Sequence, residues 1–188
     1  MAISTADFKT GLTLELEGEV YYLIGFQHVK PGKGGAFVRT KLRNVRTGNV
    51  FERTFRAGER FERALLERKE LQFLYRAGED YVFMDTESFD QLSISGEELG
   101  DSAEYLKEGL LVAALVHNER RIGIELPNSV ELLVAETDPG LRGDTATGGS
   151  KRAKLESGAV VQVPLFVSEG DLVRVDTRSG QYLERVSA

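Results

Sequence analysis

The sequence predicts an all-β protein made of small β-barrel domains. Short runs rich in β-branched and aromatic residues recur along the whole 188-residue chain, and turns containing glycine separate them. No segment has a long helical period. The chain is 41% hydrophobic, which is enough to build true cores. We expect three domains, over 1–64, 65–128 and 129–188.

The first domain is expected to be a small barrel of the SH3-like class. Its strands are predicted over 12–17, 20–29, 36–45 and 50–56. The first of these runs alternates cleanly between apolar and polar residues, which indicates a strand with one buried face. Four strands in about sixty residues are typical of such a barrel.

The second and third domains show similar strand patterns. In the second, strands are predicted over 71–75, 81–85, 89–94, 110–116 and 121–126, and Ser95 followed by Glu98 predicts the capped start of a short helix. This layout resembles an OB-fold. In the third, strands are predicted over 129–135, 159–167, 171–175 and 182–186.

A glycine-rich turn separates two strands of the first domain. It reads Lys30-Pro31-Gly32-Lys33-Gly34-Gly35. Proline fixes φ, and the glycines carry no side chain that would shield the lysine, so Lys33 is expected to point into solvent at a hairpin tip. Turn residues are common at hairpin tips, so this turn alone does not indicate a function.

Positive charge is concentrated around this hairpin. No Asp or Glu occurs from Val20 to Phe51, and the strand that follows the turn places Arg39, Lys41 and Arg43 on one face. Residues 1–64 carry a formal charge of +4, against −8 for 65–127 and −2 for 128–188. This asymmetry favours a polyanion such as RNA as a partner of the basic end. The alternative is a solvated strand face whose charges discourage aggregation.

Signatures of catalysis and metal binding are scarce. The chain has two histidines, His28 and His117, and no cysteine, which excludes three-histidine and thiolate metal sites. The turn lacks the P-loop spacing, and an exposed Lys33 is not desolvated as a Schiff-base lysine would be. We therefore expect no catalytic residue, no metal and no cofactor, and an enzyme that uses Lys33 is the weaker alternative.

The sequence does not suggest a membrane protein. The N-terminus lacks the pattern of a signal peptide, and no run approaches 18 apolar residues. A cytoplasmic location without a membrane partner is expected. A second glycine-rich stretch, 139–152, has two interpretations, a mobile surface loop or a loop that contacts nucleic acid.

Several motifs together resemble bacterial translation elongation factor P. They are the run 30–37, Gly143-Asp144-Thr145, the run 158–167 and the run 175–180, and their order matches over essentially the whole chain. The resemblance implies a KOW/SH3-like barrel followed by two OB-folds in an L-shape that mimics tRNA. It also implies a non-enzymatic factor, expected to be a monomer, that binds the 70S ribosome beside peptidyl-tRNA and relieves stalling at consecutive prolines.

The resemblance also implies roles for individual residues. Lys33 would reach the CCA end of peptidyl-tRNA, and a lysine-modifying enzyme often extends this residue in the family. The further expected site residues are those that present the lysine (Pro31, Gly32, Gly34, Gly35), those that bind the tRNA backbone (Lys30, Arg39, Lys41, Arg43) and those of the third domain that contact tRNA or the ribosome (Gly143, Asp144, Thr145, Tyr182, Arg185).

One residue departs from the family pattern. Arg152 follows Lys151 where family members often carry a proline, so a more basic and less rigid loop is expected there. A general OB-fold RNA-binding protein that acts off the ribosome is the alternative function.

Overall fold

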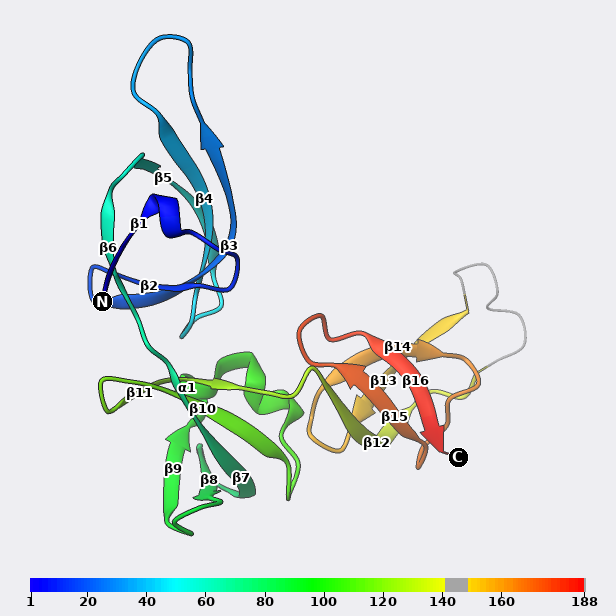
Figure 1. The fold of residues 1–188 in the computed structure, drawn as a ribbon. Helices are drawn as coiled ribbons and strands as arrows, with labels where there is room; N and C mark the ends of the chain where they lie inside the picture. Colours follow the sequence, from blue (N-terminus) through cyan, green and yellow to red (C-terminus); the bar gives the residue numbers. More distant parts are fainter. Residues whose placement is uncertain (141–148, 188) are drawn as a thin grey trace. The chain divides into compact units, whose positions relative to one another are not determined.

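The computed structural model describes residues 1–140 and 149–187 and confirms the all-β fold class. Its strands form three sheets, of six, five and five strands (Figure 1). Of the expected site residues, Gly143, Asp144 and Thr145 lie outside the described part of the chain. In the part that is described, no helix has both the length and the apolar composition needed to cross a membrane.

The first sheet has the strand order β1-β6-β2-β3-β4-β5 and curves around one core. The sequence pattern predicts four of its strands and misses β1 and β6, which have three and four residues and are too short to show alternation. The elements are β1 (Ala2–Ser4), η1 (Thr5–Asp7), β2 (Thr13–Leu16), β3 (Glu19–Val29), β4 (Phe37–Asn44), β5 (Val50–Arg56) and β6 (Arg60–Arg63).

The pleat of β4 separates the core from the solvent in this sheet. Val38, Thr40 and Leu42 are buried, and the residues between them are exposed, as the alternation predicts. Thr40 is the polar member of the buried row, and its hydroxyl donates a hydrogen bond to the carbonyl oxygen of Arg53 at 2.6 Å. This bond satisfies the buried hydroxyl, so the polar residue fits among the apolar ones.

The second sheet has the order β11-β10-β7-β8-β9. The predicted helix start is confirmed, because the side chain of Ser95 accepts a hydrogen bond from the backbone N–H of Glu98 at 3.2 Å. The helix is followed by a 3-10 segment as far as Tyr105, in keeping with the expected end at about Leu99 or beyond. The elements are β7 (Glu67–Ala77), β8 (Asp80–Asp85), β9 (Gln91–Ser95), α1 (Gly96–Leu99), η2 (Gly100–Tyr105), β10 (Leu111–His117) and β11 (Arg120–Glu125).

The third sheet has the order β14-β13-β12-β15-β16 around an aliphatic core of mainly valine and leucine. The sequence does not predict β13, because this strand begins inside the glycine-rich stretch 139–152. Tyr105 and Leu110, which precede this sheet in the chain, pack against its core. The elements are β12 (Ser129–Thr137), β13 (Ser150–Leu155), β14 (Val160–Pro164), β15 (Leu172–Asp176) and β16 (Tyr182–Ser187).

The chain forms two compact units. The first combines Met1–Arg68 with Ala114–Gly123, and the second combines Lys69–Ala113 with Ile124–Ala188. The domain limits expected from the sequence, 1–64, 65–128 and 129–188, stay predictions, because a compact unit reflects packing and can join parts of neighbouring domains.

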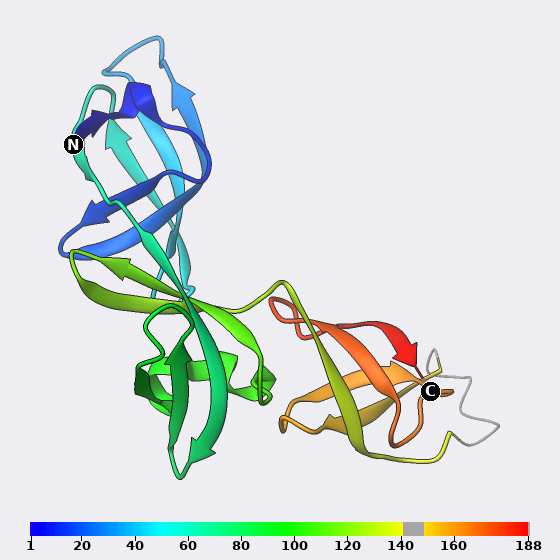
Figure 2. The same ribbon diagram turned by 60° about the horizontal axis from the view of Figure 1, so that its bottom comes forward.

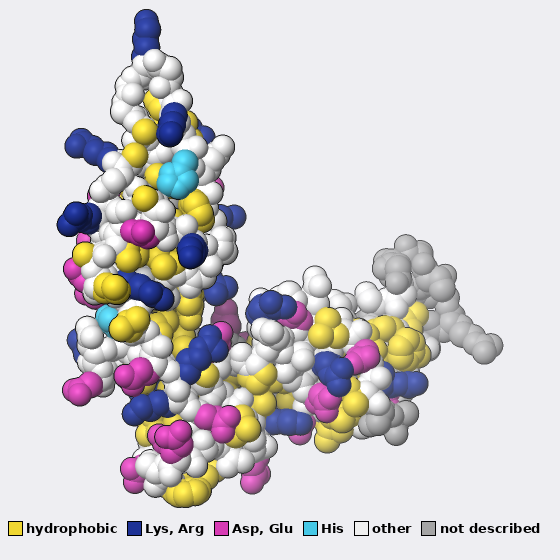
Figure 3. All heavy atoms as spheres, viewed as in Figure 1, with side chains coloured by type: hydrophobic (Ala, Val, Ile, Leu, Met, Phe, Trp, Pro, Cys, Tyr) yellow, Lys and Arg dark blue, Asp and Glu magenta, His cyan; other side chains and the backbone are white. Residues whose placement is uncertain are grey.

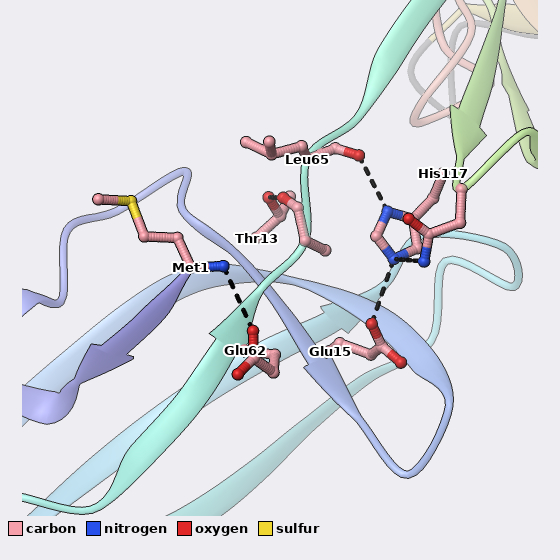
Figure 4. Close-up of polar contacts among 8 residues, drawn as sticks. Met1, Thr13, Glu15, Glu62, Leu65 and His117 are labelled. Atoms are coloured by element: carbon pink, nitrogen blue, oxygen red, sulfur yellow. Dashed lines mark hydrogen bonds and ion pairs between the residues drawn. The ribbon is translucent and has the colours of Figure 1, made fainter.

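His117 connects three segments of the first unit (Figure 4). Its Nδ1 lies 2.9 Å from the carbonyl oxygen of Leu65, and its Nε2 lies 3.2 Å from Oε2 of Glu15. A carbonyl oxygen only accepts, so Nδ1 carries the proton in the first contact. The bond to Leu65 raises the pKa of His117, burial opposes this rise, and Glu15 adds to it.

The raised pKa predicts a pH-dependent stability. The unfolded pKa of histidine is about 6.5, and the folded value is higher, so the stabilisation is complete below about 6.5 and is lost as the pH rises through the folded pKa. We expect urea unfolding between pH 5.5 and 8 to show this loss in the wild type and not in His117→Gln. The matched control is His28→Gln at the exposed second histidine, which should keep the wild-type dependence. Equal pH dependence of wild type and His117→Gln would contradict the assignment.

A neighbouring pair of leucines in β12 tests the position of the third core. The side chain of Leu132 is fully buried, whereas Leu133 is 43% exposed. Leu132→Ala should lower the free energy of unfolding by about 2–5 kcal/mol, because it removes buried methylene groups and leaves a cavity. Leu133→Ala should cost much less, and chemical denaturation compares the two variants. Similar losses for both would show that the register of β12 is wrong.

Candidate nucleic-acid interface

The β3–β4 hairpin carries the residues that the sequence singles out. The two strands pair from Tyr21 opposite Asn44 to Val29 opposite Phe37, and residues 30–36 form the turn. Figures 1 and 2 show this turn projecting beyond the rest of the first sheet. The predicted hairpin is therefore confirmed, and its tip is accessible from several sides.

The turn presents Lys33 in an open position. Lys30 and Lys33 are both exposed. Gly34 has a φ of +106°, which a residue with a side chain rarely adopts, so the backbone requires glycine there. Gly32 and Gly35 have ordinary φ values, and an added Cβ at either would meet no atom within 4 Å. Their contribution is the absence of a side chain beside the lysine.

The exposed face of β4 forms a cationic row. Figure 3 shows Lys and Arg side chains along the projecting hairpin and at its tip. The guanidinium of Arg39 lies 5.7 Å from the centre of the Phe37 ring, and that of Arg43 lies 5.3 Å from the centre of the Tyr22 ring. Both distances suit a cation–π interaction, which holds an arginine in place without neutralising its charge.

These cations lack acidic partners within the described residues. None of Lys30, Lys33, Arg39, Lys41 and Arg43 forms an ion pair there. The sixth cation of the segment differs, because the guanidinium of Arg46 lies 2.8 Å from Oε1 of Glu19. The charges of the other five are therefore available to phosphate groups.

Sequence reasoning did not identify Tyr22 and Phe37, the rings beneath the arginines. The Tyr22 ring meets Arg43 through the pairing of β3 with β4, whereas Phe37 and Arg39 are two residues apart in β4 and share one of its faces. Alternation within one strand reveals a face but not its register against the next strand. The signal that would have found them is aromatic residues in the strands on both sides of the turn.

Tyr182 and Arg185, the two third-domain site residues that the structure describes, have different surroundings. Tyr182 packs against the core of the third sheet. Arg185 instead lies with its guanidinium 5.1 Å from the centre of the Phe166 ring and 3.5 Å from the carboxylate of Asp171. Tyr182 therefore has a packing role here, and Arg185 is the exposed member of the pair.

The described part of the second glycine-rich stretch is tied to the sheet. Lys151 donates a hydrogen bond to the carbonyl oxygen of Asp138 at 2.6 Å, and Arg152 lies in β13 opposite Gln162. At this position Arg152 is a strand residue and not a loop residue. The two interpretations of the rest of this stretch concern residues outside the described part.

A pocket of about 420 Å³ lies in the first unit, and it does not resemble an active site. Its lining includes Glu15, Glu19, Arg46 and His117, and these groups pair with one another as Glu15 with His117 and Glu19 with Arg46. Over the described residues, no group of three His, Cys, Asp or Glu side chains could hold a metal ion.

Comparison with known proteins agrees with this architecture. Residues 4–61 match the model of the elongation factor P KOW-like domain, residues 66–124 match the elongation factor P OB domain, and residues 130–185 match the elongation factor P C-terminal domain. Elongation factor P of Moorella thermoacetica is 62% identical over 183 residues, which cover 97% of this chain and 99% of that protein. The protein of the same name from Pelotomaculum thermopropionicum is 60% identical over 184 residues, which cover 98% and 100%.

Solved structures share the fold at much lower identity. Translation initiation factor 5A from Methanococcus jannaschii superposes with a TM-score of 0.52 at 19% identity and covers 68% of this chain and 92% of that one. Taken with the family matches, the barrel and sheets described above are those of a translation elongation factor. The chain belongs to the elongation factor P family.

The unpaired cations predict a salt-dependent affinity for RNA. Lys41→Gln with Arg43→Gln should weaken binding to an RNA minihelix and lower the slope of log K against log salt by up to about 2, because each phosphate contact contributes about one. The control, Lys69→Gln with Lys107→Gln, removes the same charge from β7 and from the segment before β10 and should change neither quantity much. Filter binding from 50 to 200 mM salt measures both, and equal slopes for the two double variants would contradict the interface.

Proposed function

We propose that this protein binds the ribosome beside peptidyl-tRNA and stimulates peptide-bond formation at consecutive prolines. The observation that carries the proposal is the projecting turn with Lys33 at its tip and a row of unpaired cations behind it. A long flexible cation on a slender turn suits contact with the CCA end, while the strand face suits phosphates of the acceptor stem.

The chemistry in this proposal belongs to the ribosome. Proline is a poor nucleophile with a rigid ring, so peptidyl-tRNA can lie badly placed for its attack. A factor that holds the CCA end lowers the entropic cost of reaching the reactive geometry. Lys33 acts in this scheme as a positioning residue, and the protein is not an enzyme.

Several finer features belong to the same proposal. The protein acts in the cytoplasm as a monomer, and a modifying enzyme extends Lys33, whose exposed position leaves room for such an enzyme to approach. The phosphates of tRNA contact Lys30, Arg39, Lys41 and Arg43. In the third domain, Gly143, Asp144, Thr145, Tyr182 and Arg185 contribute to the contact with tRNA or the ribosome.

A reporter with a run of prolines tests the role of Lys33. In cells that lack the endogenous factor, Lys33→Ala should lose most of the rescue given by the wild type, because the tip no longer reaches the CCA end. Lys33→Arg should bind ribosomes as well as the wild type but rescue less, because it keeps the charge and blocks a lysine-specific extension. The control is a reporter without prolines, which all variants should translate equally. Full rescue by Lys33→Ala would refute the proposal.

The alternative function, a general RNA-binding protein that acts off the ribosome, makes a different prediction. Such a protein would bind free single strands tightly through exposed aromatic residues. Tight binding to single-stranded RNA in the absence of ribosomes, together with no effect of Lys33→Ala on proline-run synthesis, would favour it.

A further inference from the structure

A row of aromatic rings leads from the first core to the surface of the hairpin. The ring centres of Phe61 and Phe55 are 4.6 Å apart, those of Phe55 and Phe8 6.4 Å, those of Phe8 and Phe26 6.1 Å, and those of Phe26 and His28 5.6 Å. The first three residues are buried, Phe26 is 36% exposed, and His28 is exposed. The row therefore ends in a ring at the surface, two residues before the turn begins.

The outer two rings lie on the face of the hairpin opposite the arginines. Phe26 is paired with Thr40 and His28 with Val38, and paired residues in antiparallel strands share a face. Thr40 and Val38 are buried, so the aromatic end of the row continues the core face of the sheet. Arg39 and Lys41 occupy the other face of the same hairpin.

The His28 ring has a face available for stacking. Its contact with Phe26 has an interplanar angle of 88°, an edge-to-face arrangement. Such a contact uses at most one face of a ring. Among the described residues, the His28 side chain has no other ring contact and no hydrogen bond.

We propose that the Phe26–His28 pair is a stacking site for an unpaired nucleobase of RNA. A nucleotide combines a flat apolar base with an anionic phosphate, and the hairpin offers an aromatic surface on one face and unpaired cations on the other. The base is unpaired, because neighbours cover both faces of a base inside a duplex. This inference rests on the proposed function, since it takes RNA as the ligand of the hairpin.

The packing beneath the pair suits this role. Phe8 contacts Phe26, Phe55 and Phe61, so the core supports the inner ring of the pair. A ring held in place loses little conformational freedom when a base stacks on it. His28 is the residue to change, because its side chain lies outside the core and its removal leaves the supporting rings in place.

The test uses an RNA minihelix with an unpaired 3′-CCA end that carries 2-aminopurine in place of the terminal adenine. Stacking quenches the fluorescence of this base. We expect quenching by the wild type and by His28→Phe, which keeps an aromatic ring, and loss of quenching with His28→Leu. His28→Leu should also weaken binding by about fivefold or more, from the usual contribution of one stacked base.

Two controls make the result decisive. Tyr75→Leu removes another exposed ring, 53% exposed, in β7 and should quench like the wild type. Thermal unfolding of each variant checks that the barrel is intact. Equal quenching by the wild type and His28→Leu would overturn the proposal. Wild-type RNA binding by His28→Asn but not by His28→Phe would also overturn it, because the side chain would then act by hydrogen bonding and not by stacking.

The proline-run reporter separates this inference from the proposed function. Loss of rescue with Lys33→Ala, together with full rescue and unchanged quenching with His28→Leu, refutes the stacking site and leaves the proposed function standing. Full rescue by Lys33→Ala refutes the proposed function itself. Loss of quenching and reduced rescue with His28→Leu, both restored by His28→Phe, supports the inference.

Discussion

The pleat of β4 is the constraint on which the hairpin depends. Because side chains alternate along a strand, burial of Val38, Thr40 and Leu42 forces the residues between them to the opposite face. A slip of one residue would bury arginines and expose the core row, at a cost the fold would not tolerate. The hydrophobic core thus fixes where the cations stand, and the cations need no contacts of their own to be placed.

Charge is distributed unevenly along the chain. The chain has a net charge of −6, yet Lys30, Lys33, Arg39, Lys41 and Arg43 form no ion pairs within the described residues. Other arginines do form ion pairs, as Arg174 does with Glu131 and Glu184. An approaching polyanion is therefore attracted to the hairpin and repelled by the acidic remainder, which favours one orientation of approach.

Local patterns could be predicted from the sequence, and features set by packing between distant segments could not. The arginine face of β4 and the Ser95 helix start depend on residues close in the chain. The position of the Tyr22 ring beside Arg43 depends on strand register, and the contacts of His117 depend on Glu15, which is 102 residues away. The strand β13 was missed because its residues follow a glycine-rich run that hides the alternation.

Because open space surrounds Gly32 and Gly35, the requirement of the fold at these positions differs from the requirement of function. Neither position has a strained backbone or a close neighbour, so the fold itself accepts a larger residue at both. Between Pro31 and Gly35, Lys33 is then the one long side chain, and the glycines beside it have only backbone atoms. Under the proposed function, selection against larger residues at these two glycines would come from the space around peptidyl-tRNA and not from the stability of the protein.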